Sequence, residues 1–430
     1  MERLRQAGLR ALILVVVPLL LLSVGFAAGV AADRSFLLPE TAVQAASDTP
    51  SFNVFWQAWD LVEKHYVDRS ALDATKMTYG AVEGMLLSLG DTGHTRFLTP
   101  EDLKFEREAL SGSLEGIGAE IEVRDGLPVV VAPIPDSPAQ RAGVRSGDVI
   151  MRVDGKDVSN LSVEEVVRVV RGTPGTQVTL SLIHRGDTQI TDITITRAKI
   201  NVPSVTWSML PGTKVAHVLV SRFAERASDE TVAALKAAQE QGATAIILDL
   251  RNDPGGIRDE AIAVASQFLK DGNVLIQEDA EGKRTEFKVK PGGVALDTPM
   301  VVLINEGSAS SAEIVAGALQ DHRRAVLIGK TTFGTGTVLS SFQLSDGSAV
   351  LLGTEQWLTP SGRQIWHQGI EPDIEVTLPP DAVPLTPSQE AGLTAEQLQS
   401  SQDAQLLRAL KELSPSSHER RARPPLVKRL

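Results

Sequence analysis

The segment from residue 300 to residue 329, MVVLINEGSASSAEIVAGALQDHRRAVLIG, constrains the fold of this chain more than any other stretch. It begins with an apolar run, Met300–Ile304, whose length and β-branched content are typical of a buried strand. A polar turn follows, and apolar residues then recur at helical spacing as far as Leu319. A second apolar run, Ala325–Ile328, predicts another strand. The segment therefore predicts a strand, a helix and a second strand in succession.

Ser310 occupies the turn between the first strand and the helix. A serine at this place exposes its hydroxyl beside the unpaired N–H groups of a helix N-terminus, which suit an oxyanion. A structural explanation is also available, because serine is favoured in turns and as an N-cap, and Ser308 and Ser311 lie close by. Taken alone, the segment favours the structural explanation.

The composition excludes several classes of protein. A chain of 430 residues exceeds one typical hydrophobic core, so two or three domains are expected. The net charge of −12 argues against a nucleic-acid partner. The chain has no cysteine, which excludes disulfides, thiolate metal sites and cysteine nucleophiles. Its seven histidines follow no metal-ligand spacing, so neither a metal nor another cofactor is expected.

The N-terminal residues 1–32 predict attachment to a membrane. Three arginines precede residues 11–32, which carry no charge and exceed the roughly 20 residues that a spanning helix needs. Positive residues stay on the cytoplasmic side, so the rest of the chain is expected outside, in the periplasm or cell envelope. An uncleaved single-pass anchor in the cell membrane is favoured. Small residues near the end of the span leave cleavage as a signal peptide open.

Two further regions precede the first domain with sheet character. Residues 33–50 form a polar linker, and residues 51–113 predict a small helical cap. The helices of that cap are expected at Phe52–Tyr66 and Lys76–Leu89. A turn-rich loop with a single histidine, His94, follows the second helix.

Residues 114–198 predict short strands with one or two helices. Ser162 and Glu165 form a capping box that opens the helix Val163–Arg171. With the loop Gly116-Ile117-Gly118-Ala119, this order of motifs resembles a PDZ domain. The resemblance implies that N–H groups of the loop bind the carboxylate of a peptide C-terminus, while the peptide adds a strand to the sheet edge. Because the loop is apolar, the partners expected are polypeptides with apolar C-termini.

From residue 199 onward, strands and helices alternate, which indicates an α/β layer with a largely parallel sheet. The strands Val215–Val220 and Ala245–Leu250 flank the helix Asp229–Glu240. The second of these strands runs directly into Gly255 and Gly256, and a helix, Glu260–Leu269, is expected to follow. Paired glycines after a strand let backbone N–H groups approach a ligand closely, although they fit an ordinary strand-to-helix turn equally well.

The order of these segments resembles the carboxyl-terminal processing, or tail-specific, peptidases of serine peptidase family S41. The resemblance is carried by Leu-Arg-Asn-Asp-Pro-Gly-Gly at 250–256, Ser-Ala-Ser-Ser-Ala-Glu-Ile-Val at 308–315 and Gly-Ile-Glu-Pro-Asp at 369–373. It implies a multi-domain α/β fold, with a crotonase/ClpP-like α/β core over residues 199–413, an inserted PDZ domain and an N-terminal helical cap. Residues 414–430 are predicted to be a disordered basic tail.

The same resemblance implies roles for individual residues. Ser310 matches the nucleophile of the family. The backbone N–H groups of Ser311 and of Gly255 or Gly256 match the oxyanion hole. Acidic residues near the site, Glu313 among them, are expected to be structural.

One part of the family pattern is missing from this chain. Many members carry a lysine as general base and a glutamine that orients it, where this sequence has Thr335 and Leu339. A serine hydroxyl is a poor nucleophile without an adjacent base. The base must therefore come from elsewhere, or the protein is inactive.

Three side chains are candidates for the missing base. Lys330 is better explained as a solvated lysine at the end of a strand. His322 lies at the far end of the helix that begins beside Ser310. His94 is favoured, because the tricorn-like branch of the family is similar here, with a catalytic histidine ahead of its PDZ domain. Imidazole also titrates close to working pH.

A triad also needs an acid behind the imidazole, for which Glu355 is the first choice and Asp321 the second.

The leading prediction is an extracytoplasmic serine endopeptidase that recognises substrate C-termini through its PDZ domain and cleaves through an acyl-enzyme at Ser310. One alternative is a catalytically silent PDZ-containing peptide-binding or adaptor protein that retains the peptidase fold. A crotonase-type acyl-thioester enzyme has less support. The physiological substrate, homo-oligomerisation and the need for an activator stay open.

Overall fold

The computed structural model describes residues 50–91, 94–124, 126–134 and 136–414. The chain divides into two compact units, Met1–Met77 and Thr78–Leu430. The predicted anchor at residues 11–32, nearly all of the linker and the basic tail lie outside the described residues. Among the helices that are described, none has the length and apolar character needed to cross a membrane.

The first unit contains the helix α2 (Pro50–His65) and a short 3-10 helix, η1 (Arg69–Ala71). The α2 helix corresponds to the predicted helix Phe52–Tyr66. On it, the ring of Phe55 lies 5.1 Å from that of Trp56 and 5.9 Å from that of Trp59, measured between centroids. Side chains three and four residues apart lie on one face of a helix, which explains the contacts of Trp59 with Phe55 and, at 6.1 Å, with Trp56.

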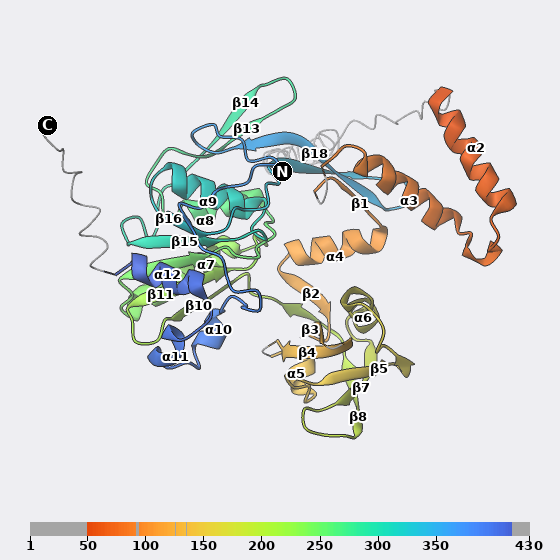
Figure 1. The fold of residues 1–430 in the computed structure, drawn as a ribbon, viewed down its shortest axis with the longest axis horizontal. Helices are drawn as coiled ribbons and strands as arrows, with labels where there is room; N and C mark the ends of the chain where they lie inside the picture. The colour runs from red at the N-terminus through yellow and green to blue at the C-terminus, as the bar shows by residue number, and fades with distance from the viewer. Residues whose placement is uncertain (1–49, 92–93, 125, 135, 415–430) are drawn as a thin grey trace, which may run out of the picture. The chain divides into compact units, whose positions relative to one another are not determined.

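The core of the second unit is a six-stranded sheet in the order β10-β11-β12-β15-β16-β19 (Figure 1). The five strands from β11 to β19 run parallel, and β10 joins the edge antiparallel. This is the predicted largely parallel α/β sheet, and β11 and β15 have the predicted bounds. The strands are β10 (Val205–Met209), β11 (Val215–Val220), β12 (Ala245–Asp249), β15 (Met300–Ile304), β16 (Val326–Gly329) and β19 (Ile374–Glu375).

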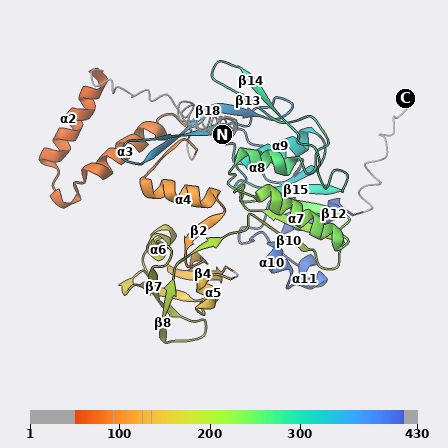
Figure 2. The same ribbon diagram turned by 180° about the vertical axis from the view of Figure 1, so that it is seen from behind.

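Helices cover both faces of this sheet (Figure 2). Along β12, Ile246 and Leu248 pack towards one helical layer while Ile247 packs towards the other, as alternation along a strand requires. The first layer contains α7 (Ala227–Glu240), α8 (Arg258–Ala265) and α9 (Ser311–Asp321). The second layer contains α11 (Ala395–Gln399) and α12 (Ala404–Glu412), which pack through Leu398 and Leu406.

Predicted helix boundaries in the first layer differ from the observed ones. The helices α7 and α8 begin at Ala227 and Arg258, each two residues before the predicted start. The α8 helix ends at Ala265, before the predicted end at Leu269. The hydroxyl of Ser266 donates to Ile262 O at 2.6 Å, and the N–H groups of the next residues bond three residues back, which tightens the turn and ends the helix.

A second sheet brings a distant segment to the core. Its order is β1-β18-β13-β14, and β17 also pairs with β18. The β1 strand pairs antiparallel with β18, so that Arg96 lies opposite Leu351, and this fixes the segment that contains His94. The strands are β1 (Arg96–Leu98), β13 (Asn273–Glu278), β14 (Arg284–Lys288), β17 (Thr337–Gln343) and β18 (Ala349–Leu358). On the chain, β1 lies between the helices α3 (Ala74–Leu87) and α4 (Pro100–Leu110).

The segment predicted to be a PDZ domain has its own sheet and its own hydrophobic core. The sheet has the order β3-β4-β5-β7-β8, which leaves β3 at an edge, and α6 contacts β3. A ribbon of β2 (Ser113–Gly116) with β9 (Ala198–Asn201) joins the two ends of the segment. The other elements are β3 (Ala119–Arg124), β4 (Leu127–Pro133), α5 (Pro138–Arg141), β5 (Val149–Val153), β6 (Lys156–Asp157), α6 (Val163–Val170), β7 (Gln177–Ile183) and β8 (Ile190–Thr196).

A buried network of charges attaches the C-terminal helices to the central sheet. His217 Nδ1 lies 2.7 Å from Glu390 Oε1, on α10 (Pro387–Glu390), and its Nε2 lies 3.0 Å from Asp249 Oδ2. Arg251 bonds to both Asp249 and Asp403, the N-cap of α12. Burial disfavours the imidazolium, but the hydrogen bonds and charges of the two carboxylates outweigh it and raise the pKa of His217 to about 9.

A His217→Ala variant is therefore expected to lower the free energy of unfolding at pH 6 by about 3–5 kcal/mol, because two buried carboxylates lose their shared cation. The pKa of His217 is higher in the folded than in the unfolded protein, so the charged imidazole stabilises the fold fully below its unfolded pKa near 6.5. This stabilisation is lost as the pH rises towards about 9. The difference in the free energy of unfolding between wild type and His217→Ala, measured by urea unfolding, should therefore decrease between pH 6.5 and about 9.

The matched control for this measurement is Lys270→Ala, which removes an exposed ion pair with Asp297. It should change the free energy of unfolding by less than about 1 kcal/mol. A difference between wild type and His217→Ala that does not vary with pH would contradict a charged His217.

Candidate active site

Ser310 lies at the junction of β15 and α9, in a strained backbone conformation with φ 51° and ψ −113°. Its N–H group donates to Glu313 Oε2 at 2.9 Å and to Thr335 Oγ1 at 2.7 Å. The neighbouring parallel strands β12 and β15 both end here. Ser310 is therefore held at the carboxyl edge of the sheet, the edge at which open α/β sheets bind ligands.

Glu313 organises the loop opposite the serine. Its carboxylate is completely buried and accepts hydrogen bonds from the hydroxyl of Thr332, the N–H of Gly334, and both the N–H and the hydroxyl of Thr335, in addition to Ser310 N–H. Thr335 stands where the family resemblance expects lysine. Its hydroxyl positions the Ser310 backbone and supplies no basic group.

Two glycines bring the loop after β12 into contact with the serine loop. Gly255 has φ 94°, and a Cβ added to it would lie 2.7 Å from the Cβ of Ser310. Gly256 has φ 142°, and a Cβ there would lie 2.3 Å from the carbonyl oxygen of Phe223. Both the backbone conformation and the close approach therefore require glycine at these positions.

The predicted donors of the oxyanion hole differ in availability. Gly255 N–H is already engaged, because it donates to Asp253 Oδ1 at 2.7 Å. No acceptor within the described part of the chain is hydrogen-bonded to the N–H of Gly256 or of Ser311. Ser311 N–H also lies at the N-terminus of α9, where the helix dipole favours negative charge. Gly256 and Ser311 are thus the pair that fits an oxyanion.

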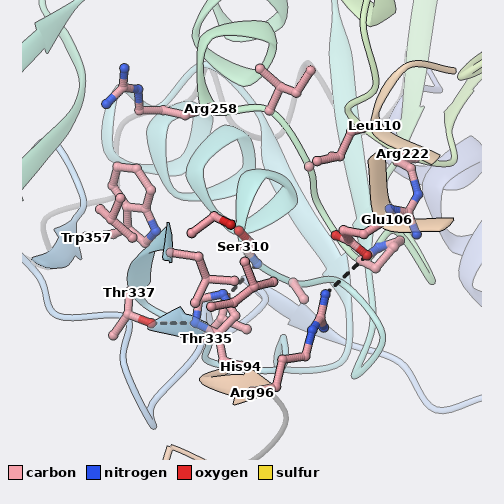
Figure 3. Close-up of a pocket in the computed structure, with 18 of the residues that line it drawn as sticks. His94, Arg96, Glu106, Leu110, Arg222, Arg258, Ser310, Thr335, Thr337 and Trp357 are labelled. Carbon is pink, nitrogen blue, oxygen red and sulfur yellow. Dashed lines mark hydrogen bonds and ion pairs between the residues drawn. The ribbon is translucent and has the colours of Figure 1, made fainter. Parts of the chain in front are cut away.

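His94 is buried in the turn before β1, and its Nδ1 lies 2.5 Å from Thr337 Oγ1 (Figure 3). Burial lowers the pKa of His94 below its ordinary value of 6.5, against the opposing charge of Asp91. With Nδ1 engaged, Nε2 is the ring nitrogen left to accept a proton. No hydrogen bond joins the His94 ring to the Ser310 hydroxyl, although both residues belong to the described part of the chain.

His94, Ser310, Thr335 and Thr337 line a single cavity of about 830 Å³ (Figure 3). Residues far apart in the sequence meet here, because β1 and β17 both pair with β18. The cavity also has apolar walls, formed by Leu103 and Leu110 of α4, Ile257, Val338, Leu351 and Trp357. Its volume is in the range of pockets that bind small molecules.

The two other candidates for a base lie elsewhere. Lys330 Nζ bonds to Glu375 Oε1 at 2.6 Å and does not line the cavity. His322 follows the last residue of α9, and its Nε2 lies 2.8 Å from the carbonyl oxygen of Asn273. Neither is in a position to take a proton from Ser310.

Neither of the two predicted acids, Glu355 and Asp321, contacts the ring of His94 in the structure. Glu355 lines a second cavity of about 410 Å³, and Asp321 bonds to Arg363 at 2.6 Å. The partner of His94 Nδ1 is instead Thr337, at the start of β17. Sequence reasoning missed this threonine because the two residues are 243 positions apart and an isolated hydroxyl carries no pattern.

The predicted peptide-binding loop lies between β2 and β3. Gly118 has φ 78°, and a Cβ added to it would lie 2.5 Å from the Cβ of Ser137. Within the described ranges, no acceptor is hydrogen-bonded to the N–H groups of Ile117 and Gly118. Two free donors beside the edge strand β3 fit a peptide carboxylate.

Comparisons with known proteins agree with this architecture. The model of peptidase family S41 matches residues 214–376, and a PDZ domain model matches residues 129–183, inside the predicted PDZ segment. The carboxy-terminal processing protease CtpA of Bacillus subtilis (strain 168) is 35% identical over 335 residues, covering 78% of this chain and 71% of that protein. A probable CtpA-like serine protease of Staphylococcus aureus (strain COL) is 36% identical over 337 residues, covering 77% of this chain and 66% of that protein.

A solved structure agrees in fold as well. The crystal structure of a putative S41 protease from Bacteroides fragilis superposes with a TM-score of 0.50 at 17% identity, and the match covers 83% of this chain and 96% of that one. The predicted multi-domain α/β fold with a PDZ domain is confirmed.

The environments of two histidines predict opposite titration behaviour. In an NMR titration, His94 should titrate below 6.5, because burial favours its neutral form, whereas His217 should titrate at about 9. His94→Gln and His217→Gln variants assign the two resonances. A pKa of His94 at or above 6.5 would show that the ring is solvated or paired with a carboxylate.

Proposed function

The chain belongs to peptidase family S41, and we propose that it is an active serine endopeptidase with Ser310 as nucleophile and His94 as general base. One observation supports this most strongly: His94 and Ser310 line one cavity, and Thr337 holds the Nδ1 of His94. That hydrogen bond orients the imidazole, as an acid does in a serine–histidine–aspartate triad. The lowered pKa keeps the ring neutral, and so able to accept a proton, at neutral pH.

The proposed reaction follows from these positions. His94 Nε2 takes the proton of the Ser310 hydroxyl as the serine oxygen attacks the scissile carbonyl carbon. The N–H groups of Gly256 and Ser311 bind the oxyanion of the tetrahedral intermediate. The imidazolium then protonates the leaving amine, and an acyl-enzyme remains. Water, deprotonated by the same imidazole, hydrolyses the acyl-enzyme and restores Ser310.

One movement is part of this proposal. His94 and Ser310 share no hydrogen bond in the structure, so the imidazole must approach the hydroxyl when substrate binds. Catalytic hydrogen bonds are often long in substrate-free enzymes and shorten in the Michaelis complex.

Substrate recognition through the PDZ domain is the second element of the proposal. The unpaired N–H groups of Ile117 and Gly118 would bind the terminal carboxylate, and the substrate would pair with the edge strand β3. The side chain of Ile117 is buried in the apolar core of this domain, and the proposal of an apolar C-terminal residue rests on the apolar composition of the loop. The named relative from Bacillus subtilis is itself a carboxy-terminal processing protease.

The proposed location is the outer side of a membrane, with the chain anchored through its N-terminus. This rests on the uncharged residues 11–32 and the three arginines that precede them.

The alternative function is a catalytically silent peptide-binding protein. Two observations favour it: Thr335 replaces the family lysine, and no hydrogen bond links His94 to Ser310. Cleavage assays separate the two functions directly.

We expect the purified full chain to cleave an unfolded protein with an apolar C-terminus. Ser310→Ala and His94→Ala should each lower kcat/KM by at least about a thousandfold, because nucleophile and base act as a unit. Lys330→Ala, the control, should stay within about twofold, because its ammonium group pairs with Glu375 outside the cavity. Full activity of His94→Ala would refute His94 as the base, and an inert wild type would favour the silent binding protein.

Peptide binding can be tested separately in the Ser310→Ala variant by fluorescence polarisation. A labelled peptide with an apolar C-terminal residue should bind at least about tenfold more tightly with a free carboxylate than with a C-terminal amide, because the amide carries no charge for the loop donors. Equal affinities would show that the loop does not bind a terminal carboxylate.

A further inference from the structure

Asp253 is a completely buried carboxyl group that the reaction described above does not use. It lies between the end of β12 and the glycine pair. Its Oδ1 accepts the N–H of Gly255 at 2.7 Å, whereas its Oδ2 is buried without any hydrogen-bond partner in the described part of the chain. An unpaired buried polar atom is costly, so its presence beside the oxyanion hole calls for an explanation.

The position of Asp253 links both halves of the oxyanion hole. Its side chain holds the N–H of Gly255, and its carbonyl oxygen accepts the N–H of Ala309, next to Ser310, at 2.9 Å. The first bond turns the Gly255 amide into the protein and leaves the N–H of Gly256 free. Asp253 therefore fixes the distance between the two loops that supply the oxyanion donors.

The surroundings of Asp253 favour its uncharged form. Burial raises the pKa of Asp253 well above its ordinary value, and the charge of Asp249 acts in the same direction. The hydrogen bond from Gly255 and the charge of Arg222 oppose this increase without cancelling it. The lack of a hydrogen-bond partner for Oδ2 independently favours the uncharged form, because burying an ionised oxygen without a donor costs more free energy than burying a neutral one.

We infer that Asp253 is a positioning residue of the oxyanion hole, which it holds together as an uncharged acid, and that its ionisation at alkaline pH weakens oxyanion binding. This rests on the proposed peptidase function. A negative charge fixed beneath the loop would repel the oxyanion of the tetrahedral intermediate, because charges interact strongly in a buried, water-poor environment. In the dependence of kcat on pH, protonation of His94 lowers the rate on the acid side, and ionisation of Asp253 lowers it on the alkaline side.

Two substitutions separate hydrogen bonding from charge. Asp253→Asn keeps the acceptor for Gly255 N–H but cannot ionise, so kcat at pH 7 should stay within about threefold and the decline at alkaline pH should disappear. Asp253→Ala removes the acceptor, so kcat at pH 7 should fall about tenfold with KM nearly unchanged, because the oxyanion forms only in the transition state. This variant cannot ionise either, so its kcat should also lack the decline at alkaline pH. Asp271→Asn, which removes an exposed carboxylate from another loop, is the charge-matched control and should retain the wild-type profile.

The protonation state of Asp253 is measured independently of activity. Infrared difference spectra of wild type minus Asp253→Asn at pH 7 should contain the C=O band of a protonated carboxylic acid. Absence of that band, or an alkaline decline that Asp253→Asn leaves in place, overturns the inference. An inert wild type would count against Ser310 and His94 as a catalytic pair, and the infrared band would then decide alone whether Asp253 is held uncharged.

Discussion

The candidate active site depends on the hydrogen bonds that the buried carboxylate of Glu313 accepts. It accepts hydrogen bonds from the backbone of Ser310 and from the loop that contains Thr335. A buried charge of this kind is stable only when several donors surround it, and here every donor also fixes part of the site. The strained backbone of Ser310 is held in place by the same contacts. Loss of this carboxylate would release the nucleophile and the opposite loop together.

The loop opposite Ser310 contacts the serine backbone although it supplies no basic group. Thr335 carries no basic group, yet its hydroxyl accepts from Ser310 N–H and donates to Glu313. Thr335 therefore holds the Ser310 backbone, and in our proposal His94 supplies the base. A residue near the N-terminus takes this place because the β1 strand pairs with β18 beside the cavity.

Sequence patterns predicted the core well and the pairwise contacts of the site poorly. Apolar runs of strand length placed β11 and β15 at their observed bounds, and the family resemblance pointed to Ser310 in the turn after β15. The contact between His94 and Thr337 depends on how β1 and β17 both align on β18, which no local pattern encodes. No local pattern shows either which glycine N–H can bind an oxyanion. Gly255 N–H cannot, because it donates to the side chain of Asp253, whereas Gly256 N–H is left free.

Activation of Ser310 by His94 can be measured as the rate at which a fluorophosphonate modifies the protein. Intact-mass measurement and peptide mapping across pH would follow the adduct in wild type and in His94→Gln. We predict a single adduct on Ser310, a rate that rises with pH through a pKa below 6.5, and a rate about a hundredfold lower in the variant. A wild type that is not modified, or a rate that His94→Gln leaves unchanged, would contradict the account.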